Sequence, residues 1–181
     1  MNHYYQDIPG WFDFEDVYRD VARDAPNGAT LVEIGCYEGR SLSFLLVEAL
    51  NSSKKLLVIG VDHFQGGEEQ WMRDDATSRS IKDICLKNCL RAGTPDFLLL
   101  AEPSVDAAKR FPDGSVWFVF IDGSHDPDSV RTDLDAWVPK IAPGGRIAGH
   151  DWGCHGVTDT VTARFGNRVI VRSPSSWEVQ L

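Results

Sequence analysis

The sequence contains little of what marks several large classes of protein. No stretch of its 181 residues approaches the roughly 20 consecutive apolar residues that span a bilayer, and the N-terminus lacks the basic start of a signal peptide. The four cysteines show neither the paired spacing of a zinc site nor a disulfide framework. Lysine and arginine number 18 against 27 acidic residues, for a net charge of −9, and they form no basic stripe. We therefore expect a cytoplasmic protein that binds a small molecule, and neither nucleic acid nor membrane.

Strand and helix patterns alternate along most of the chain. Apolar runs rich in β-branched or aromatic residues are typical of buried strands, and they occupy residues 30–34, 56–61, 97–101 and 116–121. Apolar residues at helical spacing predict helices over residues 15–25, 42–50, 81–89, 104–111, 127–138 and 157–165. This alternation predicts a single domain over residues 1–181, with an α/β, doubly wound, Rossmann-like and mostly parallel seven-stranded sheet.

The C-terminal part departs from the parallel pattern. Pro143-Gly144-Gly145 predicts a turn, after which a strand begins at Arg146. Residues 169–172 and 177–181 alternate about Ser173-Pro174-Ser175, which predicts an antiparallel hairpin at the end of the sheet.

Two segments do not fit this scheme. Residues 1–28 are rich in aromatic side chains, and residues 63–77 are polar without clear periodicity. Long structureless loops are usually functional or disordered. Both segments could fold over the binding edge as lids; alternatively, the aromatic residues pack on the sheet and the loop is mobile.

Acids and histidines gather where two predicted strands end. Asp122 follows the strand 116–121, and His150 and Asp151 follow the strand that ends at Gly149. Because a strand–helix–strand crossover is parallel and right-handed, these residues finish at the same edge of the sheet. Open α/β sheets bind their ligands at that edge.

The helix of this crossover has its own signals. Asp126 predicts the N-cap, and Pro127 occupies the first helical position. The apolar residues lie on one face of the helix, which places Arg131, Asp133 and Asp135 on the other.

The loop EIGCYEG follows the first predicted strand. Its glycines, Gly35 and Gly39, allow a tight turn and close approach of a ligand. Tyr37 stands where a dinucleotide-binding loop needs glycine, and the acids of the loop, Glu33 among them, disfavour a diphosphate. Asp62, after the second strand, can accept hydrogen bonds from ribose hydroxyls. These features favour S-adenosylmethionine, which carries an ammonium and a sulfonium, over NAD.

Two motifs carry a family resemblance. LVEIGCYEGRS resembles motif I of class I S-adenosylmethionine-dependent methyltransferases, especially those of the catechol O-methyltransferase type. IDGSHDPDSVRTDLDAWVPKIAPGGRIAGHDW resembles a bacterial branch that includes antibiotic and sugar O-methyltransferases, although Pro127 stands where tyrosine is common. The opening IPGWFDFEDVY is similar to the same branch, so the resemblance covers nearly the whole chain.

The resemblance implies which residues bind the cofactor. The acid, tyrosine and serine that the family carries in this loop fall on Glu33, Tyr37 and Ser41, and Glu102 or Ser104 would contact the adenine.

The resemblance also implies a metal and a base. The metal ligands fall on Asp122, His150 and Asp151, where magnesium or manganese is expected and His150 also admits iron or zinc. His150 could instead orient a ligand from outside the metal's own shell. His125 takes the position of the general base, and an imidazole can accept a hydroxyl proton near neutral pH.

The sequence thus predicts an S-adenosylmethionine-dependent, divalent-metal-assisted O-methyltransferase of a small hydroxylated molecule, with His125 and Asp122 as catalytic residues. Three alternatives stay open: a metal-independent N- or C-methyltransferase, an NAD-type dehydrogenase, and a non-catalytic S-adenosylmethionine-binding protein. The motifs do not specify the acceptor or the number of subunits, so a homo-oligomer is also open.

Overall fold

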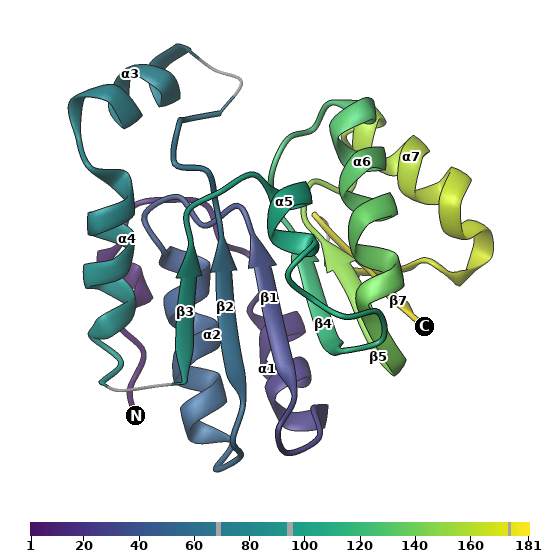
Figure 1. Ribbon diagram of the computed structural model, residues 1–181, viewed down its shortest axis with the longest axis horizontal. Coiled ribbons are helices and arrows are strands. Elements are labelled where there is room, and N and C mark those ends of the chain that lie inside the picture. Colours follow the sequence, from purple (N-terminus) through teal and green to yellow (C-terminus); the bar gives the residue numbers. More distant parts are fainter. Residues whose placement is uncertain (68–69, 94–95, 174) are drawn as a thin grey trace.

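The fold is built on one central sheet. The computed structural model describes residues 1–67, 70–93, 96–173 and 175–181, and within them seven strands pair in the order β3-β2-β1-β4-β5-β7-β6 (Figure 1). The strands are β1 (Thr30–Ile34), β2 (Leu57–Val61), β3 (Phe97–Leu100), β4 (Val116–Ile121), β5 (Ile141–Gly149), β6 (Ile170–Ser173) and β7 (Ser176–Gln180). Strands β1 to β5 are parallel, and β7 is antiparallel to both β5 and β6. The predicted fold class and its C-terminal hairpin are confirmed, with Pro174 outside the described residues.

Helices cover both faces of the sheet. One face packs against α1 (Glu15–Asp24), α2 (Arg40–Asn51) and α4 (Ile81–Leu90), and the other against α5 (Ser104–Ala108), α6 (Pro127–Trp137) and α7 (His155–Phe165) (Figure 1). Successive side chains of a strand point to opposite faces. Leu31 accordingly packs on the first side and Val32 on the second, which is why β1 is apolar throughout.

Short helices complete the chain. They are the 3-10 turns at Tyr5–Asp7, Val138–Lys140 and Gly166–Arg168, and α3 (Gln70–Ser78). In the described residues, no helix is long and apolar enough to cross a membrane. Helix α6 begins as predicted, because the Asp126 side chain accepts hydrogen bonds from the backbone nitrogens of Asp128 and Ser129.

Three local predictions are corrected by the structure. The segment 63–77 contains helix α3, whose apolar residues are too few to produce a clear period. Strand β5 starts at Ile141, and Pro143-Gly144-Gly145 lies within it at a shift of register against β4 rather than in a turn before it. Helix α5 starts at Ser104 itself, with no side-chain cap, and ends at Ala108 instead of Phe111.

Candidate functional site

A cavity of about 960 Å³ lies at the edge where the parallel strands end. It lies at the ends of β1 and β4. From β1 the chain continues to β2 and β3 on one side of the sheet and then crosses to β4 and β5 on the other, and open α/β sheets bind ligands at this reversal of strand order. Most of the predicted site residues line it: Gly35, Tyr37, Ser41, Asp62, Ser104, Asp122, His125, His150 and Asp151. The other three predicted site residues, Glu33, Gly39 and Glu102, are not among the described residues that line the cavity.

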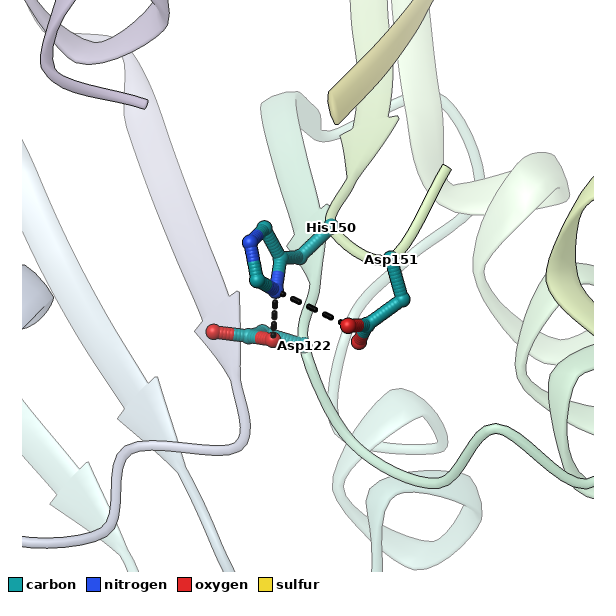
Figure 2. A group of neighbouring side chains, drawn as sticks. All are labelled: Asp122, His150 and Asp151. Atoms are coloured by element: carbon teal, nitrogen blue, oxygen red, sulfur yellow. Dashed lines mark ion pairs between the residues drawn. The ribbon is translucent and has the colours of Figure 1, made fainter. Parts of the chain in front are cut away.

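Three of these side chains converge into one cluster. Figure 2 shows Nδ1 of His150 facing two carboxylates, with Oδ1 of Asp122 at 3.3 Å and Oδ1 of Asp151 at 3.2 Å. One donor atom from each residue lies within 4.8 Å of the others. Asp122 directly follows β4, and His150 and Asp151 directly follow β5, with Asp151 at a positive φ of 60°. Their side chains converge on Asp122 (Figure 2). The crossover therefore brings together the residues that the sequence placed at two strand ends.

The charges within the cluster compensate one another. Burial would lower the pKa of His150, but hydrogen bonds and charges from Asp122 and Asp151 outweigh it and raise that pKa to about 11. Burial raises the pKa of Asp122, and His150 offsets part of that change. The pKa of Asp151 is lowered, because His150 and His125 outweigh the effect of its burial. These shifts favour a positive charge on His150 between the two carboxylates.

His125 borders the cluster. Its Nε2 lies 2.9 Å from Oδ2 of Asp151, and its side chain is 45% exposed, so it reaches both the cluster and the open cavity. A side chain on Gly156 would place Cβ 2.1 Å from the His125 carbonyl oxygen, so the start of α7 closely contacts the backbone of this loop. The sequence analysis did not identify Gly156, since nothing local marks a contact across 31 residues.

Asp13 is a further carboxylate that the sequence analysis missed. Its Oδ1 lies 3.1 Å from Nε2 of His150 and accepts a hydrogen bond from Ser175 Oγ at 2.6 Å. Phe14 places its ring 5.2 Å from that of His150. The N-terminal segment therefore contacts the cluster directly.

The loop after β1 is tied to the ends of β2 and β4. Asp62 accepts hydrogen bonds from the backbone nitrogens of Cys36 (2.9 Å) and Tyr37 (3.0 Å) through one oxygen. Gly35 has φ +87°, and a Cβ there would lie 1.9 Å from the backbone oxygen of Asp122. The glycine thus lets the cofactor-side loop touch the strand end that carries the cluster.

Glu33 lies beneath this loop instead of in the cavity. It is fully buried and accepts hydrogen bonds from the Tyr18 hydroxyl at 2.6 Å and from Ser41 Oγ at 2.9 Å. Burial raises the pKa of Glu33 to about 8, although both hydrogen bonds oppose the change. Ser41 does line the cavity, so Glu33 orients a residue at the site from behind.

The raised pKa of Glu33 makes stability depend on pH. The folded state keeps a proton that the unfolded state releases near pH 4.5, so stability is lost as the pH rises from 4.5 to about 8. Each pKa unit corresponds to about 1.4 kcal/mol, so this group accounts for roughly 3 to 5 kcal/mol over that range. We expect Glu33→Gln to flatten the pH profile of urea unfolding by that amount. A profile parallel to that of the wild type would contradict this assignment.

Two other predicted cofactor residues have structural contacts. Gly39, at φ +85°, precedes α2, and a Cβ there would lie 3.1 Å from Cys85 Sγ and 3.2 Å from Cys89 Sγ. Glu102 is bound at both oxygens by the Arg110 guanidinium, at 2.5 and 2.9 Å. Cys85 and Cys89 are both fully buried, so Gly39 packs against the core at this point.

The two candidate lid segments meet at the mouth of the cavity. Trp11 of the N-terminal segment lies 5.9 Å from Trp71 of α3 and 6.3 Å from Tyr37, measured between ring centroids. The Tyr37 hydroxyl donates a hydrogen bond to Asp75 of α3 at 3.0 Å. Trp11 and Tyr37 line the cavity. Whether these segments open and close stays a prediction.

The fold and the site together define a class of protein. A parallel sheet that ends in an antiparallel β7 inserted beside β5, with a glycine loop after β1 and an acid after β2, is a Rossmann-like methyltransferase fold. A methyltransferase-domain family profile matches residues 32–152, which is more than half of the sequence. The chain belongs to that family and is an S-adenosylmethionine-dependent methyltransferase of class I.

Solved structures share the fold. The O-methyltransferase NovP superposes with a TM-score of 0.71 at 19% identity, over 92% of this chain and 78% of that one. CalS11, a TDP-rhamnose 3'-O-methyltransferase of calicheamicin biosynthesis, gives 0.60 at 14% identity over 92% and 76%. SMU.1697c from Streptococcus mutans, solved with S-adenosylhomocysteine (SAH), gives 0.65 at 10% identity over 92% and 96%. No curated protein sequence matches the chain significantly.

Proposed function

We propose that this protein is a divalent-metal-assisted O-methyltransferase of a small hydroxylated molecule. The observation that supports the proposal is the cluster of Asp122, His150 and Asp151, with His125 beside it, on the wall of the same cavity as the cofactor loop. The fold neighbours NovP and CalS11 are described as O-methyltransferases, which is consistent with oxygen as the acceptor atom.

The donor set of the cluster fits a metal ion. Two carboxylates and one imidazole, with donor atoms within 4.8 Å of one another, suit magnesium or manganese, and the imidazole also suits iron or zinc. A metal bound there would lower the pKa of a coordinated hydroxyl and orient it for attack. Asp122 and Asp151 would supply the negative charge, and His150 would have to release a proton in order to ligate.

His125 is the residue in place to receive the hydroxyl proton. During transfer the bond from sulfur to the methyl carbon breaks and the bond from oxygen to that carbon forms, so the acceptor must lose its proton. Asp151 accepts a hydrogen bond from Nε2 of His125 at 2.9 Å and orients the ring, which leaves Nδ1 as the nitrogen that would take the proton.

Replacement of His125 tests its role as the base. His125→Gln should lower kcat by about a hundredfold or more, because a general base typically contributes 10²–10⁴. The affinity for SAH should stay unchanged. His155→Gln is the matched control, since His155 is exposed at the start of α7 and is not among the described cavity residues. Activity of His125→Gln within a few-fold of the wild type would assign the base elsewhere.

The metal-independent alternative has an observation in its favour. Both ring nitrogens of His150 face carboxylates, Nε2 toward Asp13 and Nδ1 toward the other two, so a proton alone can compensate the cluster. In that case the acceptor would be a nitrogen or carbon atom, and activity would be indifferent to EDTA.

Calorimetric titration distinguishes these functions. We expect SAH to bind without metal, and catechol, as a probe diol, to bind the SAH complex only when magnesium or manganese is present. Catechol binding that is indifferent to metal would favour the metal-independent enzyme. Absence of SAH binding would contradict the cofactor assignment itself.

A further inference from the structure

Asp133 does not occupy the solvent-facing position that helical periodicity predicted. The residue lies in α6, and its carboxyl group is half-buried and lines the cavity together with Ser104 and Gly123. An ideal Cβ built on Gly123 would be 3.9 Å from Asp133 Oδ2, so this oxygen lies close to the loop that follows β4. Helices α5 and α6 pack against each other beside the ends of β1 and β4 (Figure 1).

Ser104, which lines the cavity together with Asp133, is itself held by a buried tryptophan. Nε1 of Trp137, whose side chain is fully buried, donates to Ser104 Oγ at 2.8 Å. An indole nitrogen can only donate, so the Ser104 hydroxyl accepts this bond and keeps its own hydrogen for Asp133. Burial raises the pKa of Asp133, and the Ser104 hydrogen bond partly offsets the change. A carboxylate offers about four acceptor sites, so one bond from Ser104 would leave acceptor capacity toward the cavity.

The position of Asp133 identifies which part of the cofactor it faces. Gly35, Tyr37 and Ser41 form one end of the cavity, and Asp62 lies at the end of β2, where ribose hydroxyls are expected. Ser104 follows β3, which pairs with β2, so the α5–α6 wall adjoins the strand end that carries Asp62 and would border the base of a nucleoside whose ribose lies there. An adenine presents an exocyclic amine with two hydrogen-bond donors, whereas a 6-oxopurine presents an acceptor that a carboxylate repels.

We propose that Asp133 accepts a hydrogen bond from the exocyclic amine of adenine, with Ser104 as the positioning residue. The inference rests on S-adenosylmethionine as the cofactor of the proposed function and is independent of metal and acceptor. It reassigns the adenine contact, because Glu102 is occupied by Arg110 outside the described cavity wall. Ser104 keeps its predicted place at the adenine but acts through Asp133.

A pair of nucleosides tests this assignment. SAH and S-inosylhomocysteine differ at position 6, which is amino in the first and oxo in the second, and at N1, which carries a hydrogen only in the second. Both are titrated calorimetrically into the full chain without metal. The wild type should prefer SAH by at least about tenfold, because a carboxylate left facing an oxo group loses its hydrogen bond. Asp133→Asn should remove or reverse that preference, since the amide can donate to the 6-oxo group. Ser104→Ala should reduce the preference for SAH by less than Asp133→Asn does.

Two control variants separate recognition from folding. Glu102→Gln and Asp135→Asn should both retain the preference of the wild type, because Asp135 pairs with Arg164 on the outer side of α6. Equal affinity of the wild type for both nucleosides would overturn the assignment of Asp133. The assignment would also be overturned if Asp133→Asn weakened the binding of both nucleosides equally. A changed ratio of the two affinities in Glu102→Gln would overturn it as well. If the wild type binds neither nucleoside, the cofactor assignment fails first.

Discussion

Asp151→Asn should reduce metal-dependent methyl transfer by at least about a hundredfold while SAH binds within about twofold of the wild type. Asp151 supplies one of the two carboxylates of the cluster and also holds His125, so its loss affects both the metal and the base. Asparagine tolerates a positive φ, which this position requires at 60°, so the backbone turn should persist. The measurement is SAH release under saturating magnesium or manganese, with a panel of phenols, catechols and sugars.

A matched variant controls for the loss of one negative charge. Asp159→Asn lies on the exposed side of α7 and should retain full activity. EDTA should abolish the activity of the wild type and of Asp159→Asn alike. Full activity of Asp151→Asn, or of the wild type in EDTA, would establish the metal-independent reaction.

Gly35→Ala should lower the free energy of unfolding by at least about 3 kcal/mol. That loss should exceed the loss from alanine at a glycine with open space around its Cβ position. The added Cβ would lie 1.9 Å from the Asp122 oxygen and 2.6 Å from its carbonyl carbon, and both are backbone atoms that cannot rotate away. The ends of β1 and β4 would have to separate, which would also disturb the cofactor loop. SAH affinity should fall at least about tenfold, measured alongside urea unfolding.

Gly114→Ala separates this clash from backbone strain. Gly114 has φ +70° but nothing within 4 Å of its ideal Cβ, so alanine there should cost only about 1 kcal/mol. Similar losses in the two variants would mean that the contact between Gly35 and Asp122 does not constrain the strand ends.

The strand ends were the most predictable part of the molecule. Buried parallel strands need continuous apolar runs, and a crossover between them has a fixed hand, so the placement of Asp122, His150 and Asp151 at one edge followed from the sequence. The observed cluster agrees with that expectation. Motif I likewise located the loop that the structure places at the cavity.

Helical periodicity was less reliable where helices face a cavity. It placed Asp133 on the outer face of α6, because it registers polarity and not what lies opposite a polar residue. Periodicity also gave no signal for α3. This helix contacts the N-terminal segment through Trp71, whose ring lies beside that of Trp11. Glu33 was expected to contact the ligand, but side chains in a strand alternate between faces, and its own points toward Tyr18.

The sequence by itself determined the α/β architecture, the order of its motifs and the residue types that end each strand, because these depend on local periodicity and on short crossovers. Only the tertiary structure decided which side chains touch. Asp13 and His150 are 137 residues apart in the chain, and Trp137 and Ser104 are 33 apart. Contacts at such separations depend on how whole layers pack, and no local pattern encodes that packing.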